Sequence, residues 1–183
     1  MNSLILQKQE EVIALAQFDI KNAVLKKCIL KEGETVIAVP DGVTVIGKDA
    51  LCGLQSIIAV TLPGSLKVIN DGAFYGCSSL TSATLPDGVE RLGSCAFAQC
   101  SKLNKIYLDN KLTEIGNSAF WGCTSLESID IPAGVTKIGY NLFGSCLSLI
   151  TDIRKKVFTE VARMAYSGED YTKIGSFSAV ACR

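Results

Sequence analysis

Histidine is absent from this chain of 183 residues. Its absence removes the commonest general base, the Ser-His and Cys-His nucleophile pairs, and every imidazole metal ligand. No Cys-x-x-Cys pair occurs either, so the cysteine spacing typical of a zinc site is missing. The residues therefore predict no metal, no cofactor and no enzyme of the usual hydrolytic kinds.

The sequence also lacks an excess of charge and a long apolar run. Lys and Arg number 18, as do Asp and Glu, and the one short basic cluster, at 154–156, lies in a predicted helix beside acidic residues. A nucleic-acid partner is therefore not expected. The apolar runs stay well below about 18 residues, which excludes a membrane-spanning helix. Lys8, Glu10 and Glu11 interrupt the N-terminal apolar stretch, so it does not match a signal peptide.

The chain does contain an internal repeat with a constant interval. Leu62-Pro63-Gly64, Leu85-Pro86-Asp87 and Leu108-Asp109-Asn110 start 23 residues apart, since 85−62 and 108−85 both equal 23. The same step leads back to Val39-Pro40-Asp41 and forward to Ile131-Pro132-Ala133, which makes five copies between 39 and 153. One such unit cannot bury its apolar face alone, whereas stacked units share a continuous core. We therefore expect a solenoid.

Each repeat carries a strand signal, a small-large pair and a corner residue. The Leu-x-x-Ile-x-Leu run predicts a parallel strand, and pairs such as Ala96-Phe97 are expected on a short helical turn. The glycine of Arg91-Leu92-Gly93 and its equivalents is expected to allow a positive φ at a corner. If the rungs stack, equivalent side chains must align. The aromatic members of this column are Phe74, Phe97, Phe120 and Phe143.

The segments on either side of the repeats are predicted to cap them. Residues 1–38 form the N-terminal cap, with an amphipathic helix over 1–17 and then one or two hairpins leading to residue 39. Residues 154–183 form a C-terminal helical cap and tail, where the helix runs over 152–167 and Gly168 ends it. The pattern predicts no role for residues 170–183. The expected organisation is thus 1–38, 39–153 and 154–183.

The stretch from Leu85 to Leu103 resembles the BspA-like leucine-rich repeat, whose form is roughly (I/L)-P-x-x-V-x-x-I-G-x-x-A-F-x-x-C-x-x-L-x-x-I. The match recurs in all five copies, with departures at Leu54, Asp109 and Leu142. The resemblance implies a leucine-rich repeat solenoid with parallel strands on one face and short helical turns on the other. It also implies a non-enzymatic, adhesion-type scaffold for protein-protein contact, in a family known mainly for bacterial surface proteins. It does not identify the partner, because partners differ between members.

The eight cysteines fit a structural role better than a chemical one. Cys77, Cys100, Cys123 and Cys146 follow the repeat, as a small buried apolar residue would. Parallel side chains on stacked rungs keep their Cβ atoms about 5 Å apart, too far for an unstrained disulfide. The remaining cysteines, predicted to be free thiols, are Cys28, Cys52, Cys95 and Cys182. So many free thiols favour a reducing compartment such as the cytoplasm, whereas the family precedent favours the cell surface, so the location stays open.

The best candidate for a protein-binding site is the outward face of the predicted strands. Side chains alternate along a strand, so the residues beside the inward apolar set must point outward. These residues are Ala59, Thr61, Ser82, Thr84, Lys105, Tyr107, Ser128 and Asp130. Tyr75 and Trp121, which share another repeat position, form a secondary candidate because aromatic residues favour interfaces. For the outward strand residues the alternative is an ordinary solvated sheet surface, and for Tyr75 and Trp121 it is packing against the next turn.

Two further functions remain open at this point. The array could act as a self-assembling spacer, and the sequence does not indicate the oligomeric state. A thiol-dependent enzyme around Cys95 or Cys182 is the least favoured function. Without histidine, its thiolate would need Lys, Arg or a helix N-terminus to lower the pKa of the thiol.

Overall fold

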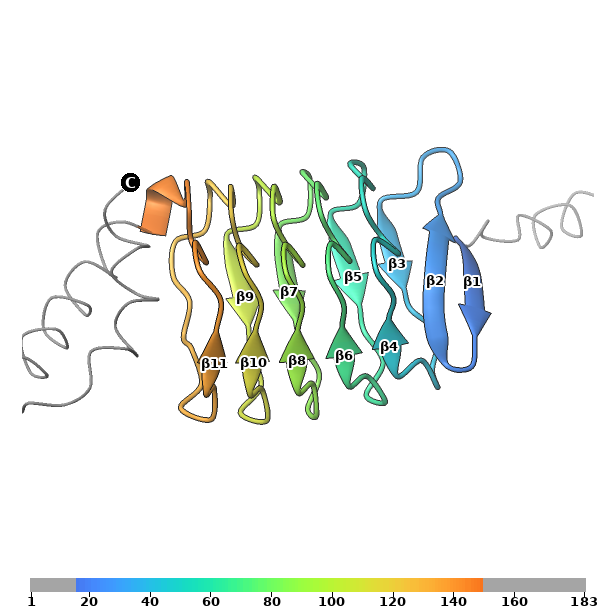
Figure 1. The fold of residues 1–183 in the computed structure, drawn as a ribbon. Coiled ribbons are helices and arrows are strands. Elements are labelled where there is room, and N and C mark those ends of the chain that lie inside the picture. The colour runs from blue at the N-terminus through green and yellow to red at the C-terminus, as the bar shows by residue number, and fades with distance from the viewer. Residues whose placement is uncertain (1–15, 150–183) are drawn as a thin grey trace, which may run out of the picture.

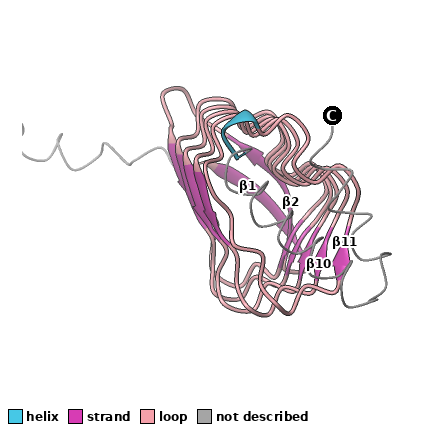
Figure 2. Cartoon of the chain, turned by 90° about the vertical axis from the view of Figure 1, so that its left-hand side faces the viewer, coloured by secondary structure: helices cyan, strands magenta, loops and turns pink. Residues whose placement is uncertain are grey.

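The computed structural model describes residues 16–149. The helix predicted over 152–167 and the tail at 170–183 lie outside these residues. The helix predicted over 1–17 lies outside them as well, except at its end, where Gln17 begins a strand instead. Over the described residues the chain winds into a coil of stacked turns, and its strands form two stacks on opposite sides of the cross-section (Figures 1 and 2).

One side of the coil carries the strands that the Leu-x-x-Ile-x-Leu run predicts, and this prediction is confirmed. They pair in parallel between residues 23 apart, for example Ser82 with Lys105 and Thr84 with Tyr107. A bridge from Lys105 to Ser128 extends the stack by one rung. The strands on this side are β3 (Val36–Ala38), β5 (Ala59–Thr61), β7 (Ser82–Thr84) and β9 (Lys105–Tyr107), paired as β3 with β5 and β7 with β9.

The opposite side carries a seven-stranded sheet that the sequence did not predict. Segments such as Val45-Ile46, read as approaches to a corner, are two-residue strands in which one residue is buried. So short a strand shows no alternating pattern, and its hydrogen-bond partners lie on neighbouring rungs. The strands, in sheet order, are β1 (Gln17–Lys21), β2 (Val24–Ile29), β4 (Val45–Ile46), β6 (Val68–Ile69), β8 (Arg91–Leu92), β10 (Glu114–Ile115) and β11 (Lys137–Ile138).

The prediction of helical turns around the Ala-Phe pairs is wrong. These residues lie in hydrogen-bonded turns, and the one helical element between residues 16 and 149 is the 3₁₀ turn η1 (Leu147–Leu149). The reason lies in the backbone. Phe74 N donates to Ala96 O and Phe97 N to Ala119 O, both at 2.8 Å, so these amides bind the next rung rather than their own turn.

The corner glycines serve a different purpose from the one predicted. Gly47, Gly93 and their equivalents do not adopt a positive φ. The left-handed conformation occurs two residues later, at Asp49, Gly72, Cys95, Ser118 and Asn141, with φ values of 54, 63, 54, 53 and 54°. At the glycine itself, a side chain would collide with the preceding rung. Glycine is thus needed at these positions because the backbones of two neighbouring rungs lie close together.

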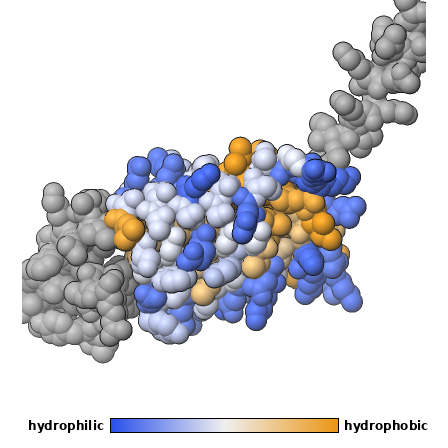
Figure 3. Space-filling view, turned by 90° about the horizontal axis from the view of Figure 1, so that it is seen from above, coloured by the Kyte–Doolittle hydropathy of each residue, from blue (hydrophilic) through white to orange (hydrophobic). Residues whose placement is uncertain are grey.

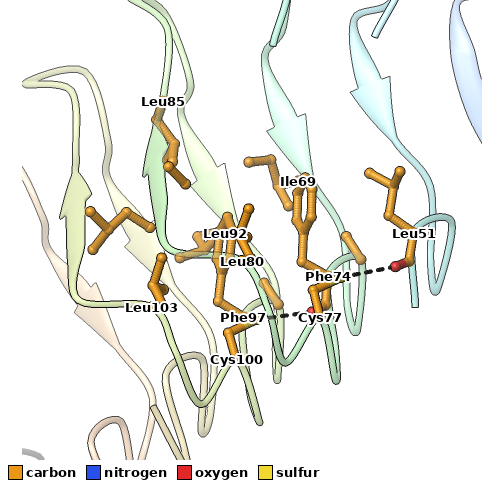
Figure 4. Close-up of a cluster of buried hydrophobic side chains, with 14 of the residues drawn as sticks. Leu51, Ile69, Phe74, Cys77, Leu80, Leu85, Leu92, Phe97, Cys100 and Leu103 are labelled. Carbon is orange, nitrogen blue, oxygen red and sulfur yellow. Dashed lines mark hydrogen bonds between the residues drawn. The ribbon is translucent and has the colours of Figure 1, made fainter. Parts of the chain in front are cut away.

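The core consists of columns of identical side chains, as expected. The ring centroids of Phe74 and Phe97 lie 4.7 Å apart, those of Phe97 and Phe120 6.1 Å, and those of Phe120 and Phe143 5.8 Å, all with stacked planes. Figure 4 shows Phe74 and Phe97 together with aliphatic residues of the core around them. The predicted alignment of the phenylalanines is therefore confirmed.

A hairpin closes the N-terminal end of the described coil (Figure 1). Strands β1 and β2 are antiparallel, and β2 then pairs in parallel with β4, so the hairpin extends the seven-stranded sheet. The run at 35–37, expected to belong to a hairpin, becomes β3 and pairs in parallel with β5 instead. In the part of the chain that the structure describes, no helix is long and apolar enough to cross a membrane.

Candidate binding surface

The strand face lies where the sequence placed it. We use this name for the outward side chains of β5, β7, β9 and the rung at 128–130. Seven of its eight predicted residues are exposed and Ala59 is half-buried. The inward neighbours Ala83, Leu85 and Ile106 are buried at 2, 4 and 4% exposure, so the alternation holds along β7 and β9. On β5, Ala59 and Val60 are both half-buried. The exposed members are Thr61, Ser82, Thr84, Lys105, Tyr107, Ser128 and Asp130.

Two residues of the same face were missed from the sequence. Val36 and Ala38 on β3 pair with Ala59 and Thr61 and are exposed. They fall within the predicted N-terminal cap, residues 1–38, ahead of the first of the five copies. A step of 23 residues back from Ala59 and Thr61 would have located both. The strand face therefore begins one rung earlier than predicted.

The most distinctive feature of the strand face is a pair of long side chains on β9. The Lys105 ammonium lies 4.7 Å from the centre of the Tyr107 ring, and half of Tyr107 is exposed. This contact with Tyr107 raises the pKa of Lys105, so the ammonium stays charged. A cation over the face of an aromatic ring is attracted by the negative charge of that face. The two side chains thus lie in contact with each other on the exposed side of β9.

The outward face of the opposite sheet changes from apolar to charged along the coil. Its register aligns Val45, Val68, Arg91, Glu114 and Lys137 in one row. Arg91 Nε lies 3.5 Å from Glu114 Oε1, with both side chains well exposed. An exposed ion pair of this kind contributes little, between about 0 and 1 kcal/mol. The Arg91 and Glu114 charges in this row thus already pair with each other.

The secondary candidates Tyr75 and Trp121 are exposed at 40 and 36%. Between them on the intervening rung, Ala98 is fully buried. On the rung after Trp121 lies Gly144, where an added Cβ would sit 2.5 Å from Trp121 Cδ1. Trp121 therefore lies against the next turn. That packing accounts for part of its buried area and leaves the strand face as the stronger candidate.

The repeat cysteines are buried in their own column. The thiols of Cys77 and Cys100 donate to the carbonyls of Leu51 and Phe74, each at 3.1 Å, as the dashed lines in Figure 4 show. A hydrogen bond with Cys77, together with burial, raises the pKa of Cys100, and burial raises the pKa of Cys146 to about 12. These thiols remain protonated at neutral pH and are poor nucleophiles.

Between residues 16 and 149, the other thiols and the polar side chains are not grouped as in a catalytic or metal site. Cys95 is half-buried, Cys52 is exposed, and Cys182 lies outside the described residues. Burial, followed by the charge of Glu34, raises the pKa of the Cys28 thiol to about 11. Over the same range, no group of three or more Cys, Asp or Glu side chains is placed to hold a metal ion. No polar or charged side chain is buried there either.

Several solved structures share this fold. A leucine-rich repeat protein from Bacteroides ovatus is 29% identical with a TM-score of 0.68, over 76% of this chain and 40% of that one. A leucine-rich repeat protein of T. pallidum is 28% identical with a TM-score of 0.68, over 74% of this chain and 66% of its own. One from Eubacterium ventriosum is 29% identical with a TM-score of 0.54, over 61% and 30%. The chain thus spans 40% of the length of the Bacteroides ovatus protein and 66% of the length of the T. pallidum protein.

A search of curated proteins found no match. The model of the BspA type leucine-rich repeat region, in contrast, matches residues 19–150 with six copies. The sixth copy fits the structure, because the residues before 39 already supply β2 and β3 to the two stacks of strands. The match covers well over half of the sequence and agrees with the parallel register. The chain belongs to the BspA-type leucine-rich repeat family.

Proposed function

We propose that this chain is a non-enzymatic scaffold that binds a partner protein through the strand face. Leucine-rich repeat proteins are generally protein-interaction scaffolds, which supports the class of function. The observation that carries the choice of surface is the Lys105–Tyr107 pair, in which an ammonium group lies over an exposed aromatic ring.

The chemistry of the strand face fits a protein partner. Tyrosine is enriched in protein interfaces and is one of the residues that most often dominates their affinity. The residues beside the pair are short, with Ser82 and Thr84 on the neighbouring strand β7. Short hydroxyl side chains let a partner backbone approach closely and provide hydrogen bonds at its edge. We place the centre of the proposed contact at Tyr107, with β7 and the rung at 128–130 around it.

A paired substitution tests this function. The variant Lys105→Ala/Tyr107→Ala should lose about tenfold or more of its partner binding, as expected when an interface loses a residue of high energetic weight. Its free energy of unfolding should change by no more than about 0.5 kcal/mol, because both side chains are at the surface. Proteins captured from cell or host extract on the immobilised full chain would be quantified by mass spectrometry.

The matched control is Lys137→Ala/Tyr140→Ala. It removes the same two residue types from exposed positions, with Tyr140 exposed at 67%, at the opposite side of the coil. Proteins retained by the wild type and by this control, but lost with the Lys105 and Tyr107 variant, would support the proposal. Equal retention by all three proteins would contradict it.

A further inference from the structure

Three aliphatic side chains are exposed together at the N-terminal end of the described coil. Ile29, Val36 and Ile58 are exposed at 53, 54 and 45%. Together we call them the aliphatic corner. Figure 3 shows hydrophobic surface gathered toward this end of the molecule, while most of the remaining visible surface is polar. Exposing three large aliphatic residues in one region is unfavourable unless something covers them.

Hydrogen bonds connect the segments that carry the corner. Ile58 N donates to Thr35 O at 2.7 Å, and the Ser56 hydroxyl donates to Glu34 O at 3.1 Å. These bonds hold the segment before β5 against the start of β3. Ile29, at the end of β2, pairs with Gln17. The three aliphatic residues therefore surround the place where the described chain begins.

The Glu34 carboxylate binds the backbone at Ala16, the first residue that the structure describes. Its Oε1 accepts a hydrogen bond from Ala16 N at 2.8 Å, and its Oε2 accepts one from Lys31 N at 3.2 Å. Ala16 itself is buried, with 7% exposure. The carboxylate thus holds the backbone at residue 16 against the turn that leads into β3. Residues 1–15 join the coil at this point, beside the aliphatic corner.

The N-terminal segment carries its own apolar side chains. Leu4, Leu6, Val12, Ile13 and Leu15 recur near helical spacing in the sequence. A segment tethered within a few residues of a complementary surface has an effective concentration of about millimolar. A second copy of the chain at micromolar concentration therefore competes poorly with the tethered segment for the aliphatic corner. Two apolar surfaces joined in this way are expected to bury each other.

We propose that residues 1–15 bind back onto the aliphatic corner of the same molecule. The corner shares Val36 with the strand face, where Val36 is the register partner of Ala59. The bound segment would therefore cover the first rung of the strand face. A partner protein on Tyr107 would approach from the other end of that face.

Amide hydrogen exchange on the full chain, read by mass spectrometry of the N-terminal peptide, tests the proposal. In the wild-type protein, the amides of residues 1–15 should exchange about tenfold or more slowly than those of the same peptide alone. The variant Val36→Lys/Ile58→Lys should abolish this protection. Ile58→Lys alone, which leaves β3 intact, should reduce it. The circular dichroism spectrum of each variant establishes that the coil has folded.

The control substitution is Leu147→Lys, which places the same charge on an exposed aliphatic residue, 65% exposed, at the other end of the described coil. It should leave the protection unchanged. Exchange at the free-peptide rate in the wild type, or protection that survives both Ile58 variants, would overturn the proposal. So would protection that rises between about 1 and about 100 µM protein, because the occupant would then be a second copy.

Discussion

At the corner glycines, the backbones of neighbouring rungs approach so closely that a side chain would collide. A Cβ on Gly93 would lie 2.5 Å from Asp71 N and 2.6 Å from Asn70 C, and one on Gly47 would lie 2.5 Å from Leu25 O. All three are backbone atoms of the preceding rung. A flexible side chain could turn aside, but a hydrogen-bonded rung cannot move without displacing its neighbours. Glycine is therefore required by the spacing between rungs, about 4.8 Å.

The variant Gly93→Ala tests this requirement. We expect a loss of at least about 2 kcal/mol in the free energy of unfolding, because the added methyl group forces two backbones apart. Gly64→Ala is the matched control, since a Cβ there meets no atom within 4 Å and the residue does not have a positive φ. Urea denaturation of both variants measures the difference. Equal stability would mean that the rungs separate more easily than their packing indicates.

A second test at the residue scale concerns Asp109, which stands where the other repeats have proline. Its Oδ2 accepts hydrogen bonds from Lys111 N at 2.9 Å and Gly88 N at 3.1 Å. These backbone donors lower the pKa of the carboxyl group below its ordinary value of 3.8. The ionised side chain ties two consecutive turns together, a role that proline cannot perform.

The pH dependence follows from the sign of that shift. A carboxyl group with a lowered pKa in the folded state stabilises the protein fully above its unfolded value of 3.8. The contribution disappears as the pH falls through the folded pKa. We therefore expect the difference in free energy of unfolding between the wild type and Asp109→Asn to be constant from pH 5 to 7. Below about pH 4 the wild type should lose stability relative to Asp109→Asn. Thermal melts across this range measure it, and parallel pH profiles for the two proteins would refute the assignment.

At the scale of the elements, columns of side chains take the place of helix packing. The Phe97 ring stacks between Phe74 and Phe120, at centroid distances of 4.7 and 6.1 Å. Each rung also bonds to the next through the backbone on the turn side, as Phe97 N does to Ala119 O at 2.8 Å. The apolar column and the amide ladder thus hold the same turns together.

Phe97→Ala should lower the free energy of unfolding by about 3 to 5 kcal/mol, because it removes a fully buried ring and leaves a cavity between two others. Tyr107→Ala, which also removes an aromatic ring but from an exposed position, should change it by less than about 0.5 kcal/mol. Chemical denaturation of the two variants gives the comparison. An unchanged midpoint for Phe97→Ala would contradict the stacked core.

The outer edge of the seven-stranded sheet is protected against pairing with another chain. Strand β1 is largely exposed and carries Asp19 and Lys21, and its pairing with β2 shifts register between Asp19 and Ile20. Charges and irregular register at an edge both discourage addition of a further strand. The β1 edge of the seven-stranded sheet is thus unfavourable for strand addition.

At the scale of the whole molecule, the coil is stabilised by contacts between neighbouring rungs. In such an array each rung depends on the two beside it, so opening an inner rung breaks two interfaces, whereas opening a terminal rung breaks one. Cys77, Cys100 and Cys123 sit in inner rungs with no exposed surface. Burial raises the pKa of Cys123, which further slows its reaction with an alkylating reagent.

Alkylation followed by peptide mass spectrometry can measure this coupling. We expect Cys77, Cys100 and Cys123 to react about a thousandfold more slowly than the exposed Cys52, and together, at the rate of global opening. Adding denaturant should equalise the four rates. A column cysteine that reacts as fast as Cys52 in the native protein would show that its rung opens independently, and an unusually fast Cys95 would revive the thiol-enzyme alternative.

The sequence alone determined the period of the coil and the inward side chains of the Leu-x-x-Ile strands. A repeated apolar position such as Phe97 has one way to become buried in every copy, which is to stack on its equivalents. The alternation around Ile106 then assigned Lys105 and Tyr107 to the surface, because neighbouring residues on a strand face opposite ways. Both conclusions rest on properties of a single repeat.

The tertiary structure decided the features that depend on two rungs at once. It turned Val45-Ile46 into a strand, placed Val36 on the strand face, and assigned Gly93 to close approach rather than to a positive φ. In each case the deciding atoms belong to the adjacent rung, about 23 residues away in sequence, where local pattern carries no information about distance. Hydrogen bonds and backbone contacts between rungs become visible only when the rungs are stacked.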